Sequence, residues 1–424
     1  MDIQGGGGTF AFDPTSSITN NGGIGFSING GTSNVSFGGT IASSATGRSV
    51  QVQNHTGGAV SFSGSVTDTG LVLGINLANN TGGSITFSGP TQTLNTGANT
   101  ALTLNANNGA SISFSNLAIS TTTGAGVAAT GANSSVTLSG TNNPGLGAPA
   151  FTFANTSGTY DYSALTSSQS NIGLAFNNTQ TGTYKLGSLT IANAPGAAAF
   201  SGNTTAANIT VANLTVTSAA GIGLSLNGDT GSFAITGTTT INTAGGDAID
   251  LNNVSGSLNL GNVSITNAAT TGLVLTNSSA AVTAGTVTVN GATTGLQFGV
   301  NTAGSFIATG ATNLTNITTT GNDANGAAAP IFTSARACGH EALARDALPG
   351  SLEAQLRYYF NVANMEGCSH SAASEGPWSN QEGPKTSAGL SVFACRREGE
   401  EAASLLRRDS AKEIAVTPNS VVAA

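Results

Sequence analysis

The chain repeats a short phrase at a fixed interval, and this repeat limits its fold more than any other feature. Residues 54–64 read NHTGGAVSFSG, and residues 79–89 read NNTGGSITFSG. An asparagine closes a short alternating apolar stretch in each interval, at positions 29, 54, 79, 107, 133, 178, 203, 227, 252, 277 and 301. Low-complexity sequence would not hold that phase, so each interval of about 25 residues is read as one structural unit.

Each unit has the sequence pattern of three short strands. In residues 221–245, apolar residues alternate with polar ones at 222–226 and at 233–235, and a third short stretch centres on Ile241. Alternation with a period of two, interrupted by turn residues, is typical of strands. Such a small unit cannot bury its apolar face alone, so successive units must stack. We therefore predict a parallel β-solenoid of about eleven coils, roughly 50 Å long at about 4.8 Å per coil.

The repeated asparagine suits the corners of such a coil. Asparagine tolerates the left-handed backbone conformation that a sharp corner requires, and stacked asparagine side chains hydrogen-bond from coil to coil. Glycine meets the same backbone demand at other corners. We therefore expect ladders of asparagine along the rod.

The repeat divides the chain into segments. We predict an N-terminal lead-in at 1–22, a β-helix at 23–327 and a compositionally distinct tail at 328–424. The interval between the markers at 133 and 178 is too long for one unit, so we predict an insertion at 143–170. It is read as a loop or a short irregular coil that projects from the rod, and it is either a tolerated insertion or a binding segment. In the second case its binding residues would be Tyr160, Asp161 and Tyr162.

The tail differs sharply from the repeats. All three cysteines and the single tryptophan of the chain lie beyond residue 330. The tail is interpreted as a short helical cap over the last strand, as a disordered segment, or as sequence translated out of frame. It also contains weak zinc-ligand candidates, but their one-residue Cys-to-His spacing departs from the usual pattern, so no metal site is predicted. These candidates are Cys338, His340, Cys368, His370 and Cys395.

Charge excludes several classes of partner. Only 7% of residues are charged, the net charge is −8, and Arg48 and Lys185 are the only basic residues before position 336. A nucleic-acid interface needs a basic patch, and so does docking on anionic lipid. We therefore predict no nucleic-acid partner. We also predict no membrane span in this chain, because it contains no long apolar run.

The aspartates of the repeats are the best indication of whether this chain could be an enzyme. Asp229, Asp247 and Asp250 form the densest group in the repeats, and polysaccharide cleavage commonly needs paired carboxylates in one cleft. Asp250 should point outward, and no basic residue lies near the three in sequence. They are read as solvated turn and face residues, and His55 is read as a surface turn residue. We therefore predict no catalytic residues and no cofactor. The alternative is a polysaccharide lyase or hydrolase that uses these three aspartates.

A third hypothesis is an ice- or surface-binding solenoid. Outward threonine columns can order water on a flat face. The segments TTTIN at 238 and TVTVN at 286 supply such positions. The coil between them reads NVSITN, and we expect it to interrupt the column.

Segments such as GLVLGINLANNTGGSITFSG and GDAIDLNNVSGSLNLGNVSITN resemble the repeats of bacterial autotransporter passenger domains and filamentous-haemagglutinin-like adhesins. The resemblance covers about residues 20–320. It implies a right-handed parallel β-helix that is secreted or displayed on the cell surface as an adhesive stalk. The implied partners are glycans or proteins of host or neighbouring cells, with end-to-end self-association as a further contact. No secretion signal precedes the repeats, so we expect a fragment of a longer protein.

Overall fold

A computed structural model describes most of the repeat region. The described residues are 1–318 except 21, 45, 132, 178–179 and 300–303, together with the strand Ile331–Phe332. Most of the tail lies outside the described residues. The same holds for all of the zinc-ligand candidates, Cys338, His340, Cys368, His370 and Cys395.

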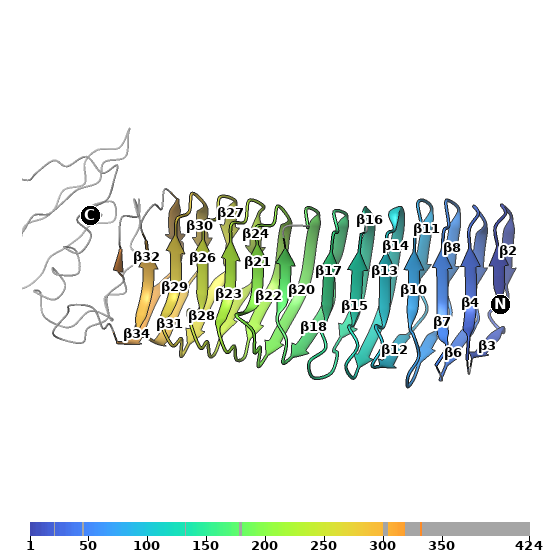
Figure 1. The fold of residues 1–424 in the computed structure, drawn as a ribbon, viewed down its shortest axis with the longest axis horizontal. Coiled ribbons are helices and arrows are strands. Elements are labelled where there is room, and N and C mark those ends of the chain that lie inside the picture. The colour runs from blue at the N-terminus through green and yellow to red at the C-terminus, as the bar shows by residue number, and fades with distance from the viewer. Residues whose placement is uncertain are drawn as a thin grey trace, which may run out of the picture.

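The described chain is a parallel β-solenoid of about 12 turns, and its strands stack into a straight rod (Figure 1). The first strand of successive coils forms one side of the rod, in two hydrogen-bonded sheets that meet between β17 and β19. These strands are β1 (Asp2–Gln4), β4 (Ile24–Asn29), β7 (Arg48–Gln53), β10 (Ile75–Ala78), β13 (Leu102–Asn105), β15 (Val127–Thr130), β17 (Phe151–Ala154), β19 (Leu174–Asn177), β21 (Ala198–Asn203), β23 (Ile222–Asn227), β26 (Ile249–Asn252), β29 (Thr271–Thr276), β32 (Thr294–Phe298) and β35 (Ile331–Phe332).

The second and third strands of each coil belong to one large sheet. The second strands are β2 (Thr9–Phe12), β5 (Asn34–Phe37), β8 (Ala59–Phe62), β11 (Ser84–Phe87), β24 (Phe233–Ile235), β27 (Ser257–Asn259), β30 (Ala281–Ala284) and β33 (Ser305–Ala308). The third strands are β3 (Ser17–Asn20), β6 (Thr40–Ser43), β9 (Val66–Asp68), β12 (Gln92–Gly97), β25 (Thr238–Ile241), β28 (Asn262–Thr266), β31 (Val287–Ala292) and β34 (Thr312–Ile317). In the middle of the rod one long strand takes both places, as in β14 (Asn108–Thr121), β16 (Asn133–Asn142), β18 (Thr159–Ser170), β20 (Thr183–Ala192) and β22 (Asn208–Val216).

The predicted insertion at 143–170 is wrong. Strand β17 pairs with β15, and β18 lies between β16 and β20, so this segment is an ordinary coil of the stack. Its corner residue is Asn155, which has a φ of 55° and was not counted as a marker. The long interval therefore holds two coils, and the rod has about 12 turns instead of eleven.

The predicted lead-in at 1–22 also contains a coil. Strands β1, β2 and β3 pair in parallel with the next coil at β4, β5 and β6. Residues 1–20 are therefore part of the solenoid, and the predicted start of the β-helix at residue 23 is wrong.

The core is a column of stacked apolar side chains inside the rod. The ring centroids of Phe62 and Phe87 lie 4.5 Å apart, and those of Phe87 and Phe114 lie 4.2 Å apart, with nearly parallel planes. Each ring occupies the same register position as its neighbour, because strands β8, β11 and β14 pair residue by residue. Such stacked aromatic pairs add to the stabilisation that burial already provides.

The predicted left-handed asparagine corners are confirmed at three of the described marker positions, whereas at others a neighbouring residue such as Ala106, Thr204 or Gly228 is left-handed instead. Asn54, Asn79 and Asn277 have φ values between 50° and 57°. On the outside of the corner, the Nδ2 of Asn54 donates to the Oδ1 of Asn29 over 2.8 Å, and Asn277 donates to Asn252 over 3.0 Å. These bonds link successive coils and supplement the backbone ladder.

Gly64 is a corner at which no side chain fits. A Cβ atom added there would lie 1.8 Å from the carbonyl oxygen of Gly39 in the preceding coil. We expect Gly64→Ala to lower the free energy of unfolding by about 1–3 kcal/mol, because the coils must separate to admit the methyl group. Urea denaturation of the full chain measures this loss. Gly8→Ala is the matched control, since a Cβ at Gly8 meets nothing within 4 Å. Equal midpoints for the two variants would contradict the close approach of the coils.

Candidate functional site

The three candidate catalytic aspartates do not form one cluster. Asp250 lies between buried Ile249 and Leu251 on β26, so it points outward as predicted. Asp229 follows the corner after β23 and is only 5% exposed. Its Oδ1 accepts the backbone N–H of Thr205 over 2.8 Å. One carboxylate therefore faces solvent, and another is buried against the neighbouring coil.

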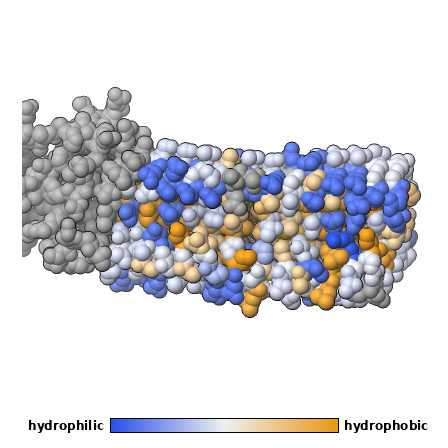
Figure 2. All heavy atoms as spheres, viewed as in Figure 1, coloured by the Kyte–Doolittle hydropathy of each residue, from blue (hydrophilic) through white to orange (hydrophobic). Residues whose placement is uncertain are grey.

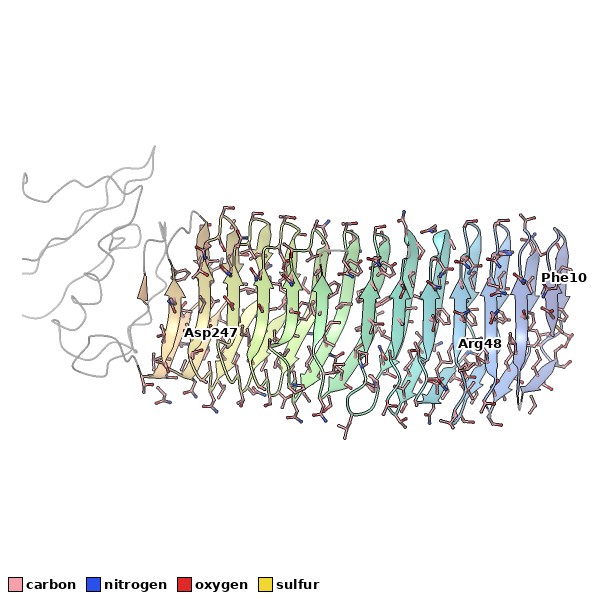
Figure 3. The ribbon with its side chains drawn as sticks, viewed as in Figure 1. Phe10, Arg48 and Asp247 are labelled. Atoms are coloured by element: carbon pink, nitrogen blue, oxygen red, sulfur yellow. The ribbon has the colours of Figure 1, made fainter. Side chains whose placement is uncertain are left out.

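Asp247 and Asp250 do influence each other. Burial raises the pKa of Asp250, and the negative charge of Asp247 raises it further. The Asp247 carboxylate is already hydrogen-bonded within the protein. Its Oδ1 accepts a hydrogen bond from the hydroxyl of Thr270 over 2.6 Å and one from the N–H of Thr271 over 2.9 Å. Arg48, the first basic residue of the rod, lies far along it from Asp247 (Figure 3). The described residues contain no group of three or more His, Cys, Asp and Glu side chains able to hold a metal ion.

Asp229 belongs to a set of buried side chains that we call the inner polar column. Its members follow a corner and turn into the rod, where most of them hydrogen-bond to the neighbouring coil. The N–H of His55 donates to the Oδ1 of Asn80 over 3.0 Å, and the N–H of Val254 donates to the hydroxyl of Ser278 over 3.1 Å. The buried members of the column are His55, Asn80, Asn107, Thr156, Gln180, Thr205, Asp229 and Ser278.

The inner polar column corrects two interpretations made from the sequence. Asp229 is not a solvated turn residue, and burial raises its pKa to about 6 although the Thr205 N–H lowers it. His55 is not a surface residue, since its exposed fraction is 0%. Burial lowers the pKa of His55, which favours the neutral imidazole. In both cases the preceding corner turns the side chain inward, and a polar residue at that place gives no sequence signal of burial.

The prediction that Tyr160 and Tyr162 bind a ligand is wrong. Both are 0% exposed, and the Tyr160 ring stacks on that of Tyr184 with centroids 5.1 Å apart. They occupy alternate positions of β18, so both point into the core and only Asp161 between them points outward. The alternation of 160–162 is the sequence signal that could have found this. Asp161 pairs with Lys185 over 3.5 Å at the surface.

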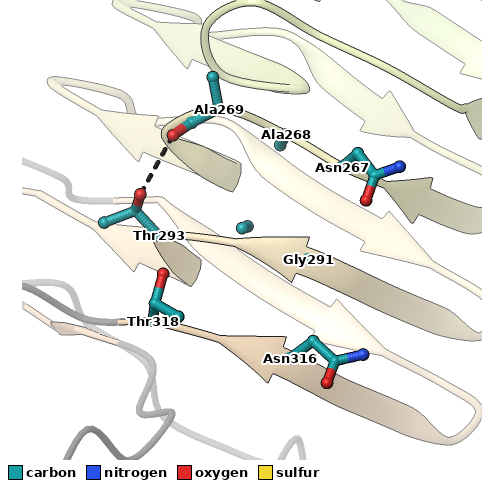
Figure 4. A pocket seen from close by; sticks show the side chains of 8 residues that line it. Asn267, Ala268, Ala269, Gly291, Thr293, Asn316 and Thr318 are labelled. Atoms are coloured by element: carbon teal, nitrogen blue, oxygen red, sulfur yellow. Dashed lines mark hydrogen bonds between the residues drawn. The ribbon is translucent and has the colours of Figure 1, made fainter.

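A shallow groove lies at the corner near the C-terminal end of the described rod (Figure 4). Its floor is made of small residues, Ala268, Gly291 and Ala292. Amide and hydroxyl groups surround this floor, and Thr293 donates to the carbonyl oxygen of Ala269 over 3.1 Å. The polar residues of the lining are Asn267, Thr293, Asn316 and Thr318. The lining can exchange hydrogen bonds with a hydroxyl-rich ligand, but it holds no charged group for acid–base chemistry.

The sequence reading missed this groove because its residues are ordinary corner residues. Asn267 and Asn316 adopt φ values of 57° and 51°, as other corners do. The signal that could have found it is the recurrence of Asn-Ala or Gly-Ala at 267 and 291, which leaves no large side chain over the corner.

The outer faces carry columns of hydroxyl groups. The threonine column is interrupted as expected, because Ser264 stands at that place in the intervening coil, but the serine keeps a hydroxyl there. The column is in register over five successive coils, at Thr190, Thr215, Thr240, Ser264 and Thr288. Figure 2 shows the visible face as a mixture of hydrophilic and near-neutral residues with a few strongly hydrophobic ones among them. The exposed large apolar side chains of the rod include Leu71, Leu73 and Leu146.

The chain matches no protein-family model, no curated protein and no solved structure. Among the described residues no helix has the length and apolar character needed to cross a membrane.

Proposed function

We propose that this chain is the rigid, adhesive shaft of an exported bacterial surface protein. The observation that carries the proposal is the in-register stack of coils from Asp2 to Ile317, in which one sheet of second and third strands runs through every coil. Each coil is bonded to the next along its strands and by side chains at its corners. A rod of this kind holds its two ends at a fixed separation and presents long flat faces between them.

The character of those faces supports the adhesive part. Hydroxyl and amide groups dominate them, and Lys185 with Asp161 is the ion pair found within the described residues. Glycans and protein backbones offer matching donors and acceptors. Because few charges are involved, attraction to such partners should not depend on ionic strength.

The groove supports a more specific contact. Asn267 lies at its rim in a left-handed conformation that glycine also adopts freely. Asn267→Gly therefore removes the amide and keeps the backbone. We assign the groove to a hydroxylated ligand such as a surface glycan.

Binding of the purified full chain to arrayed glycans and to whole cells tests this function. We expect binding that changes less than about two-fold between 0.15 and 1 M NaCl, because screening acts on charges alone. Asn267→Gly should weaken it by about 3–10-fold through the loss of one or two hydrogen bonds. Asn193→Gly is the matched control, since this exposed corner has a φ of 52° and lies outside the groove lining. Absence of binding to every glycan and cell type would overturn the adhesive role. Loss of binding at high salt would overturn the uncharged mode of contact.

A further inference from the structure

One edge of the rod carries several copies of the tripeptide Asn-x-Ser/Thr, and in five of them the first and third residues are both exposed. These five occupy the corner that follows the first strand of a coil, after β7, β10, β17, β26 and β29. Because the coils are in register, these corners stack along the same edge. Asn-x-Ser/Thr, with any middle residue except proline, is the acceptor sequence for N-linked glycosylation. The five copies lie at 54–56, 79–81, 155–157, 253–255 and 277–279.

The five tripeptides share one geometry. The asparagines have φ values between 50° and 57° and are exposed. The middle residues are at most 1% exposed and anchor the corner from inside the rod. The serine or threonine at the third position is exposed again. The acceptor amide and the hydroxyl of each tripeptide therefore face solvent, although the residue between them is buried.

The asparagines differ in what their amide nitrogens do. The Nδ2 of Asn54 donates to Asn29 over 2.8 Å, and that of Asn277 donates to Asn252 over 3.0 Å. Asn79 and Asn253 make no side-chain hydrogen bond with other described residues. Asn79 is one coil from Asn54, and Asn253 is one coil from Asn277, a separation of about 4.8 Å that leaves room for one glycan per pair. In each pair the asparagine outside the ladder is the better acceptor.

We propose that Asn79 and Asn253 are N-glycosylation sites. A glycosyltransferase would use a sugar activated by a phosphate ester, on either a nucleotide or a lipid. A bond forms between Nδ2 and the anomeric carbon, the bond from that carbon to the phosphate oxygen breaks, and the phosphate leaves with the electron pair. Nδ2 loses one proton to a base of the transferase. The inference rests on the proposed export, because these acceptor sequences are used on exported chains.

A further copy of the acceptor sequence provides an internal control. Asn213, at the first position of 213–215, lies within strand β22, where its side chain is half-buried. Its Nδ2 donates to the hydroxyl of Ser188 over 3.0 Å, and its Oδ1 accepts the N–H of Thr238 over 3.0 Å. An enzyme that acts on the folded rod cannot use this amide without breaking these hydrogen bonds to the neighbouring coils. Asn213 should therefore remain unmodified.

Mass spectrometry of the full chain, recovered from the surface or medium of cells that produce it, tests the proposal. Chymotrypsin is the suitable protease, because Arg48 and Lys185 are the only tryptic sites in the first 335 residues. We expect a hexose or N-acetylhexosamine on Asn79 and Asn253 and none on Asn213. Thr81→Ala should abolish the modification of Asn79, and Thr81→Ser should retain it.

The outcomes separate this inference from the proposed function. An unmodified chain on the cell surface overturns the inference and leaves export standing. An unmodified chain confined to the cytoplasm overturns both. Equal modification of Asn213 overturns the selection of sites by corner geometry.

Discussion

Phe87→Ala should lower the free energy of unfolding by about 3–5 kcal/mol, the typical loss for a buried aromatic ring. The Phe87 side chain is 0% exposed and is sandwiched between the rings of Phe62 and Phe114. Removing it leaves a cavity that neither neighbour can fill, because both are held in register by their own strands. The rings above and below then each lose one stacking partner.

The loss should be local, because each coil of a solenoid contacts only its neighbours. Hydrogen exchange followed by mass spectrometry measures this directly. Protection should fall in β8, β11 and β14 and remain in β28 and β31. Phe10→Ala is the matched control, since Phe10 is 41% exposed on the first coil and should cost less than about 1 kcal/mol. Equal effects of the two variants would contradict the stacked core.

The second large effect concerns Asp68, a carboxyl buried at the end of β9. Its exposed fraction is 0%, and its Oδ2 accepts the hydroxyl of Ser49 over 3.0 Å. Burial raises the pKa of Asp68 to about 7, although the Ser49 hydroxyl and the charge of Arg48 lower it. The folded chain therefore holds a proton on Asp68 at a pH at which the unfolded chain has released it.

The direction in which stability changes with pH follows from this difference in proton binding. Between about pH 4 and pH 7 the folded state binds more protons than the unfolded state, so stability falls as the pH rises. The expected loss on going from about pH 4 to about pH 8 is on the order of 4 kcal/mol from this residue. Asp229, with its pKa also raised by burial, acts in the same direction.

Asp68→Asn removes the ionisable group and keeps an oxygen for the Ser49 hydroxyl. We expect the melting temperature at pH 8 to rise and its dependence on pH to become shallower. Calorimetry between pH 4 and pH 8 measures both. Asp13→Asn is the control, because Asp13 is exposed and its pKa is lowered by hydrogen bonds from Thr15. A variant at Asp68 that is less stable at pH 8 would show that the carboxylate is stabilised in the folded state.

The sequence was sufficient to predict the parallel solenoid. Apolar residues at alternate positions, with asparagine and glycine at the corners, admit few other folds once the period is seen. The same features explain the confirmed orientation of Asp250. Its neighbours Ile249 and Leu251 point inward, so it must point outward.

The errors arose where one signal was trusted above another. The coil containing Asn155 resembles an insertion in sequence because its prolines and tyrosines differ from the other units, although its strands alternate as theirs do. His55 and Asp229 were read as surface residues because they are polar. Their burial depends on the corner that precedes them and, for Asp229, on the backbone N–H of Thr205 in the neighbouring coil, which polarity alone does not reveal. The groove around Asn267 depends on small residues of two successive coils, a pattern visible only once the coils are stacked.

Distances between spin labels along one face test the unbroken stack most directly. With Cys338, Cys368 and Cys395 replaced by serine, cysteines at Ser61 and Thr210 would carry the labels. The structure places six coil steps between them, so pulsed electron spin resonance should give about 29 Å at about 4.8 Å per step. Ser36 and Thr137, four steps apart in a segment that does not include 143–170, should give about 19 Å and calibrate the step. A distance of about 24 Å between the first pair, one step too few, would mean that 143–170 projects from the rod and would contradict the continuous shaft.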